Sequence, residues 1–133
     1  MSLHYKKTFQ ITPDHLDNNQ HVNNVIYVEW MQTLALMHAS QMGWDKEKYL
    51  EQRVTWVAKQ HIVNYHKQVF LDDQIIGTTW IDSAKSSSCI RKYEFIDNTA
   101  HLVCSGQTQF VLINTETQRP TRIPKIWKAA FGF

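Results

Sequence analysis

The chain has 133 residues, of which 43% are apolar, so residues 1–133 are expected to form a single domain with a core that needs neither metal nor disulfides. A net charge of +2 is too small to indicate binding to nucleic acid. Only Cys89 and Cys104 are present, in two different predicted strands, so we expect no disulfide framework and a reduced, cytoplasmic compartment.

The first predicted element is a strand from Tyr5 to Ile11, and a polar loop from Pro13 to Gln20 follows it. The segment before this strand lacks the apolar centre of a signal peptide. Asp, Asn and Gln side chains compete with helix formation by bonding to the nearby backbone, which favours an irregular loop here.

Three polar residues of this region, Asp17, Asn19 and His21, follow one another at intervals of two. A helix would point Asn19 away from the other two, whereas a loop can bring all three together. Asn23 and Asn24 come next and are candidate N-caps. We therefore expect a carboxylate, an amide and an imidazole to face a helix start, where unpaired N–H groups can hold an oxyanion.

The apolar run that follows predicts a long buried helix from about Asn24 to Met42, with Gly43 as its C-terminal stop. Glu29 makes this short span costly in lipid, so no membrane insertion is expected. Residues Asp45 to Gln52 predict a further short turn of helix.

From Arg53 onward the apolar period changes to two, and β-branched and aromatic residues are frequent. Turn residues separate four predicted strands, which we expect to form an antiparallel meander. The strands are Thr55 to Val69, Gln74 to Asp82, Ser88 to Asp97, and Leu102 to Asn114.

A helix that is apolar on nearly all sides needs a curved sheet around it. The predicted order therefore resembles the hotdog fold, an α+β architecture with an antiparallel sheet of about five strands around one long central helix. The polar loop agrees with this, because DLDxNxHVNNxxY is approximated by the segment from Asp14 to Tyr27. This motif is similar to that of the acyl thioesterases, the branch with 4-hydroxybenzoyl-CoA and plant-type acyl-carrier-protein (acyl-ACP) thioesterases.

The resemblance implies a thioesterase that hydrolyses an acyl-CoA or acyl-ACP thioester without a metal or cofactor. It implies that Asp17 acts as general base or as nucleophile, and that Asn19 and His21 orient the water and the thioester. It also implies substrate contacts by Asn23, by the backbone N–H near Asn24, and by Tyr27.

The chain departs from the plant-type pattern on the second predicted strand. That family places an acid and a cysteine where this chain has Gln68 and Val69, which leaves Asp17 as the main candidate base. Hotdog domains generally pair, and an open sheet edge favours pairing, so a homodimer or homotetramer is expected.

Other interpretations remain open. Taken singly, Asp17 and Asn19 are ordinary turn formers, Asn23 and Asn24 are ordinary caps, and His21 is an ordinary loop residue. A hotdog hydratase or dehydratase has a motif closer to Asp-x-Asn-Pro-x-His, with one more residue and a proline. A non-catalytic acyl-CoA-binding protein is the third alternative.

Positive charge gathers near the C-terminus, where four cations follow Thr117 without any acid. Such a patch can meet the phosphates of a cofactor or an acidic carrier protein, although a solvated face is the simpler interpretation. The cations are Arg119, Arg122, Lys125 and Lys128.

Overall fold

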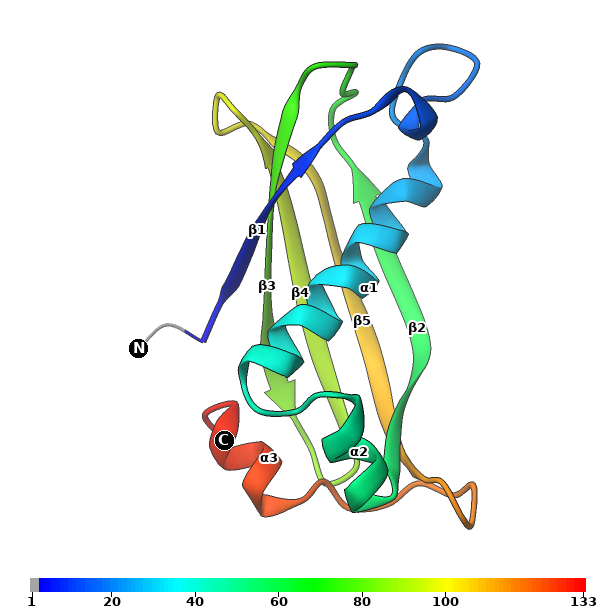
Figure 1. The fold of residues 1–133 in the computed structure, drawn as a ribbon, viewed down its shortest axis with the longest axis vertical. Coiled ribbons are helices and arrows are strands. Elements are labelled where there is room, and N and C mark those ends of the chain that lie inside the picture. The colour runs from blue at the N-terminus through cyan, green and yellow to red at the C-terminus, as the bar shows by residue number, and fades with distance from the viewer. Residues whose placement is uncertain (1–2) are drawn as a thin grey trace.

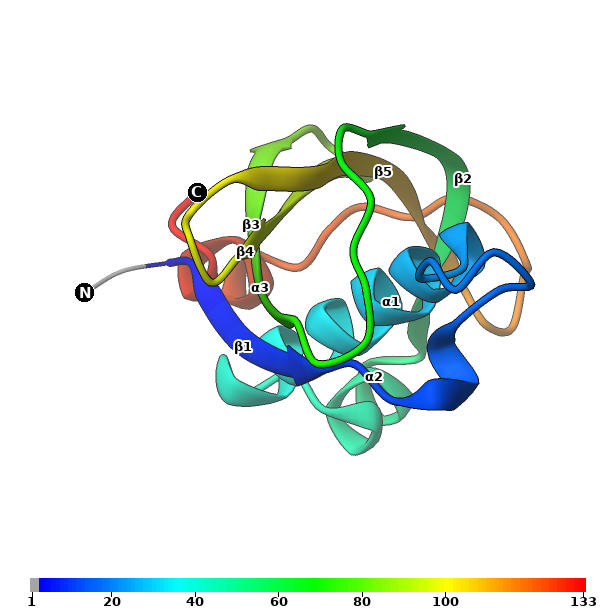
Figure 2. The ribbon, with the colours of Figure 1, turned by 90° about the horizontal axis from the view of Figure 1, so that it is seen from above.

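The structure is a computed structural model, and it describes residues 3–133. A five-stranded antiparallel sheet curves around one long helix, α1 (Figures 1 and 2). The elements are β1 (Tyr5–Gln10), the 3-10 turn η1 (Pro13–His15), α1 (Asn24–Gln41), α2 (Lys46–Gln52), β2 (Val54–Tyr65), β3 (Gln74–Ala84), β4 (Ser88–Asp97), β5 (Leu102–Asn114) and α3 (Lys125–Ala130). The predicted hotdog architecture is confirmed.

The predicted four-strand meander is wrong, because the strand order is β1-β3-β4-β5-β2. Strand β2 pairs with β5, and only β3, β4 and β5 follow one another as hairpins. The segment between β2 and β3 crosses the open end of the sheet near the start of α1 (Figure 2). Strand β2 therefore lies at the edge of the sheet opposite β1, beside a strand far from it in sequence, and no local turn signal reveals such a pairing.

Most boundaries lie within two residues of the expected ones, and three differences are larger. Pro13–His15 form one 3-10 turn inside the predicted loop, and β2 ends at Tyr65 instead of Val69. The sequence did not predict α3, a six-residue helix whose Trp127 is buried. The start of α1 agrees with the prediction, since Asn23 is its N-cap and Gly43, at φ +88°, follows its last turn.

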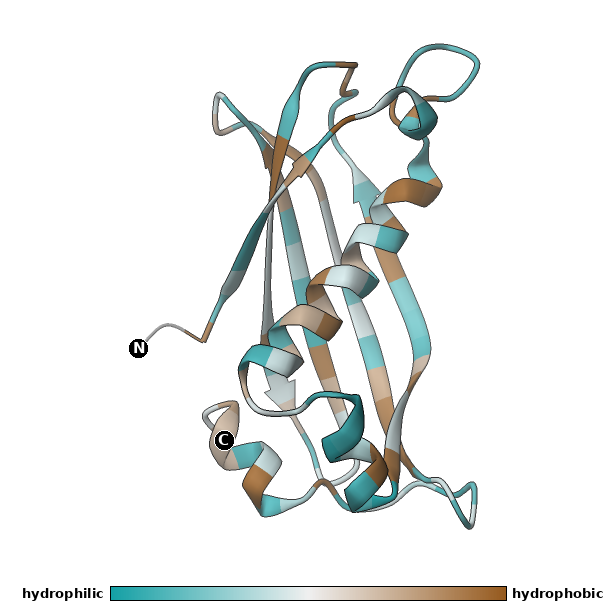
Figure 3. Ribbon diagram, in the orientation of Figure 1, coloured by the Kyte–Doolittle hydropathy of each residue, from teal (hydrophilic) through white to brown (hydrophobic). Residues whose placement is uncertain are grey.

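The interior has two apolar clusters along α1. The cluster nearer the helix start contains Trp30, Met31 and Phe95, and the one nearer its end contains Trp44 and Trp127. Hydropathy alternates along the strands as the polar and apolar residues face opposite sides (Figure 3). Trp30 and Met31 are buried in the first of these two clusters, so they pack the core.

Two glycines let α1 lie directly on the sheet. A Cβ at Gly77 would come within 2.9 Å of Leu34 Cδ1, and one at Gly106 within 2.5 Å of Met31 Cε. Side chains at these positions would push the helix outward. Within residues 3–133, no helix has the length and apolarity needed to cross a membrane.

Candidate active site at the start of α1

The polar loop is closed by reciprocal bonds between Asp17 and His21. Asp17 Oδ1 accepts the backbone N–H of His21 at 3.1 Å and that of Asn19 at 2.8 Å. The Asp17 N–H donates to the His21 carbonyl oxygen at 2.8 Å. These bonds give Asp17 a structural role through one carboxylate oxygen.

Further backbone bonds fix the loop to its surroundings. Leu16 and Val22 form an isolated antiparallel bridge, and the Asn23 N–H donates to the His15 carbonyl oxygen at 2.8 Å. The Val22 N–H donates to the carbonyl oxygen of Val69 at 3.0 Å. The loop is thus held against both the helix start and the segment that leads to β3.

Asn23 binds two of the first amides of α1. Asn23 Oδ1 accepts the Val25 N–H at 3.0 Å, and the Asn23 carbonyl oxygen accepts the Ile26 N–H at 2.9 Å. The Asn24 N–H has no hydrogen-bond partner among residues 3–133. A free N–H at the positive end of an eighteen-residue helix is suited to receive an oxyanion.

The carbonyl group of Asn24 is held in place by a residue of β2. The Tyr65 hydroxyl at the end of β2 donates to the Asn24 carbonyl oxygen at 3.2 Å. The Tyr65 ring also contacts the Tyr27 ring, with the centroids 5.8 Å apart. No sequence pattern singles out Tyr65, because an aromatic residue in a strand carries no signal for a bond to a distant helix.

The side chains predicted to be catalytic lie at the surface of the molecule. Asp17 and His21 are half-buried, and Asn19 is exposed. The His21 ring lies edge-on to Phe70, with centroids 5.3 Å apart. Asp17 Oδ2 has no hydrogen-bond partner in the part of the chain that the structure describes.

The three residues predicted to contact the substrate have different environments in the structure. Asn23 is exposed and uses its side-chain oxygen as the helix cap, while Asn24 presents the unpaired amide. Tyr27 is buried in the core, where desolvation raises the pKa of its phenol. Its hydroxyl is sealed from solvent without a partner within residues 3–133.

The two oxygens of the Asp17 carboxylate have different surroundings. Asp17 Oδ1 shapes the turn, and Asp17 Oδ2 is left to accept a proton or to attack an electrophile. The Asn24 N–H supplies a donor on the same side of the domain, at the end of α1 to which the loop is bonded (Figure 1). Together these groups suit chemistry at an activated carbonyl.

The two cysteines do not fit a nucleophilic role. Cys89 and Cys104 are buried on β4 and β5, and burial raises the pKa of each thiol to about 12. A thiol with such a pKa is almost wholly protonated at neutral pH. Reaction at sulfur is therefore disfavoured in the folded chain.

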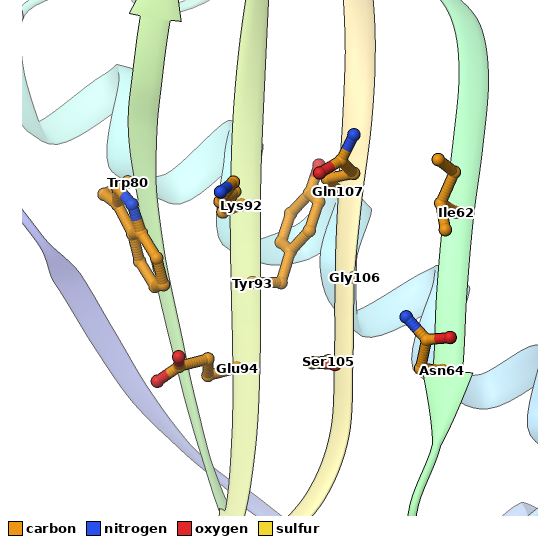
Figure 4. Close-up of a pocket in the computed structure, with 9 residues that line it drawn as sticks. All are labelled: Ile62, Asn64, Trp80, Lys92, Tyr93, Glu94, Ser105, Gly106 and Gln107. Atoms are coloured by element: carbon orange, nitrogen blue, oxygen red, sulfur yellow. The ribbon is translucent and has the colours of Figure 1, made fainter.

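A shallow pocket of about 230 Å³ lies on the sheet face opposite α1 (Figure 4). Lys92 and Glu94 line it and alternate along β4 with Tyr93 and Phe95, which are buried on the helix side. Trp80 of β3 stacks on His4 at its border, with ring centroids 4.7 Å apart. This pocket is remote from the polar loop.

Residues 2–130 match the family model of the acyl-ACP thioesterase N-terminal domain. The chain belongs to this family of thioesterases. The predictions of a hotdog-fold acyl thioesterase and of a thioester hydrolase are thereby confirmed. No curated protein matches the chain in sequence.

Several solved structures superpose closely on the chain. DHNA-CoA thioesterase from Staphylococcus aureus has a TM-score of 0.87 at 20% identity, covering 97% of this chain and 89% of the other. The protein SAV2348 from the same organism, solved in complex with CoA, has 0.92 at 15%, covering 97% and 82%.

The 12:0-ACP thioesterase from Umbellularia californica has a TM-score of 0.88 at 20% identity. The superposition covers 99% of this chain but only 54% of the plant chain. At these identities the likeness establishes the fold alone.

Proposed function

We propose that this thioesterase hydrolyses an acyl-CoA or acyl-ACP thioester, with Asp17 as the reacting carboxylate and the Asn24 N–H as the oxyanion donor. The observation that carries the proposal is the unpaired Asn24 N–H, because the next two amides of the helix, those of Val25 and Ile26, are already bonded to Asn23. Asp17 Oδ2, on the loop bonded to the same helix start, supplies the base.

The reaction balances with these groups alone. Asp17 takes a proton from water, the oxygen of water attacks the thioester carbonyl, and the Asn24 N–H stabilises the resulting oxyanion. The tetrahedral intermediate collapses with cleavage of the C–S bond, and protonated Asp17 returns the proton to the departing thiolate. Direct attack by Asp17 through a mixed anhydride, which water then hydrolyses, gives the same products.

Asn19 and His21 are assigned orienting roles. Both backbone amides bind Asp17 Oδ1, so their positions and that of the carboxylate change together. The His21 ring, braced edge-on by Phe70, is placed to hold water or the thioester. Tyr27 supports the helix start from within the core and is proposed to contact the acyl group.

The acyl carrier is proposed at the level of its chemistry. Similar structures include a CoA complex and enzymes named for CoA and for ACP thioesters, so a pantetheine-linked thioester is the shared substrate class. We propose a cytoplasmic location, consistent with two buried free thiols.

Free-thiol release from a panel of aliphatic and aromatic acyl-CoA and acyl-ACP substrates tests this function. Chelator should leave the rate unchanged, and the protein's own buried thiols should add little background. Turnover on none of these, together with hydration of a trans-2-enoyl thioester, would replace the thioesterase with the hydratase alternative.

A further inference from the structure

A second pocket, of about 820 Å³, is lined by residues of α1, α2 and the inner face of the sheet. The end of α1 and α2 lie at the end of the domain away from the polar loop (Figure 1). The first residue of α1 that lines the pocket is Gln32. At a rise of roughly 1.5 Å per residue, Gln32 lies about 12 Å along the helix axis from Asn24. Five aromatic side chains line the pocket: Trp44, Tyr49, Trp56, Phe110 and Trp127.

The aromatic walls are held in place by their own contacts. The Tyr49 hydroxyl accepts the indole N–H of Trp56 at 3.0 Å and that of Trp127 at 3.2 Å. The rings of Trp56 and Trp127 lie 5.2 Å apart. Because these bonds use the polar atoms of both indoles, the walls offer mainly apolar surface, as a pre-formed ligand site does.

Two cations are also among the lining residues, the exposed Lys46 and the buried Arg91, and only Arg91 lies inside the pocket wall. The environment of Arg91 is unusual. This residue is only 4% exposed, and its Nη1 donates to Thr79 Oγ1 at 3.0 Å and to His38 Nδ1 at 2.9 Å. Its Nε and Nη2 have no hydrogen-bond partner within residues 3–133. A guanidinium has five N–H donors, so several remain for a ligand.

No acid balances this charge. Among the described residues no carboxylate forms an ion pair with Arg91. His38 cannot serve as a counter-ion, because burial and then the Arg91 charge lower its pKa to about 4 and leave it neutral. Burying a cation without an anion is costly, and a bound carboxylate would remove that cost.

We propose that this pocket binds a medium-chain monocarboxylic acid, with the carboxylate on Arg91 and the alkyl chain along the aromatic walls. Apolar walls and a single buried cation suit an amphipathic anion. The acidic residue at the rim, Asp45, is committed to capping α2 through the Lys48 N–H at 2.9 Å.

Equilibrium binding to the intact chain tests the proposal without any turnover, so its outcome is independent of the thioesterase activity. Three ligands share a ten-carbon chain and differ in the head group: decanoate, decan-1-ol and decylamine, each kept below micelle formation. Quenching of the pocket tryptophans reports binding. Decanoate should bind about tenfold or more tightly than decanol, the size of one charge-assisted hydrogen bond, and decylamine most weakly.

Substitutions then locate the carboxylate. Arg91→Met should bring decanoate to within about threefold of decanol, whereas Arg53→Met should change neither, since Arg53 is exposed and paired with Glu116 at 2.8 Å. Equal binding of decanoate and decanol by the unmodified protein would overturn the proposal, even if Arg91→Met fails to fold. An unchanged preference for decanoate in folded Arg91→Met would overturn it as well.

Discussion

Asp17 and His21 bond to each other twice across the polar loop: the Asp17 N–H donates to the His21 carbonyl oxygen, and the His21 N–H donates to Asp17 Oδ1. One oxygen of the carboxylate thus builds the turn while the other remains unpaired among residues 3–133. An amide in place of the carboxylate preserves the first role and abolishes the second, so substitution can separate structure from chemistry.

Asp17→Asn is expected to lower kcat by about 10² or more, the low end of what a positioned acid–base group contributes. The asparagine oxygen can still accept the Asn19 and His21 amides, so the melting temperature should change little. The measurement is steady-state thiol release together with thermal unfolding.

Asp14→Asn is the matched control for Asp17→Asn. Asp14 is an exposed acid of the same loop that accepts the Thr12 hydroxyl, and kcat should stay near the unmodified value. Near-normal turnover in Asp17→Asn at unchanged melting temperature would reduce Asp17 to a turn residue.

Asn23→Ala should lower the free energy of unfolding by about 1 kcal/mol, because the Val25 N–H loses its cap. It should also lower kcat, since a frayed helix start no longer fixes the Asn24 N–H. Chemical denaturation and steady-state kinetics measure the two effects. Asn23→Ser retains a capping oxygen and should restore both; failure of serine to restore activity would contradict a purely capping role for Asn23.

The free energy of unfolding should fall as the pH is lowered below about 6.5, because His38 takes up a proton more readily in the unfolded chain than in the folded one. Its pKa is about 4 in the folded chain because of burial and then Arg91, against 6.5 when unfolded. Between these values the unfolded state takes up the proton first, so the free energy of unfolding drops by up to about 1.4 kcal/mol per pH unit. Denaturant titrations from pH 7.5 to 5 measure this slope.

His38→Asn removes the titrating group but keeps an oxygen acceptor for Arg91 Nη1. Its stability should therefore depend less on pH over the same range. Parallel pH profiles for the two proteins would assign the acid sensitivity to other groups.

Gly106→Ala should destabilise the fold by about 1–3 kcal/mol, as expected for overpacking. The added Cβ would lie 2.5 Å from Met31 Cε and 3.0 Å from the Ile62 carbonyl oxygen. Combining it with the shorter Met31→Leu should recover part of the loss, because only the contact with Met31 is relieved. Strict additivity in a double-mutant cycle by chemical denaturation would show that α1 does not press on this glycine.

The protein is expected to be a homodimer or a dimer of dimers, since β2 is an edge strand with exposed Val57, Ile62 and Tyr65. Light scattering at micromolar concentration measures the mass. Val57→Lys should weaken the association, while Leu36→Lys, an exposed site on α1, is the control. A monomeric mass for the unmodified protein would contradict the prediction.

The helix start and the polar loop could be read from the sequence because their determinants are local. An asparagine caps its own helix within two residues, and the carboxylate of Asp17 bonds to amides two and four positions later. Periodicity likewise located the strands, since it depends only on which face of each strand is buried. The family resemblance came from these same local residues.

The tertiary structure alone decided which strands pair and which polar atoms stay unbonded. The pairing of β2 with β5 and the bond from Tyr65 to Asn24 join residues far apart in sequence, so no local preference encodes them. The environment of Arg91 is of the same kind: its burial beside His38, with no acid in reach among the described residues, arises only when β4 packs on α1. Burial and hydrogen-bond satisfaction are properties of the packed molecule, and they determine where charge remains available for a ligand.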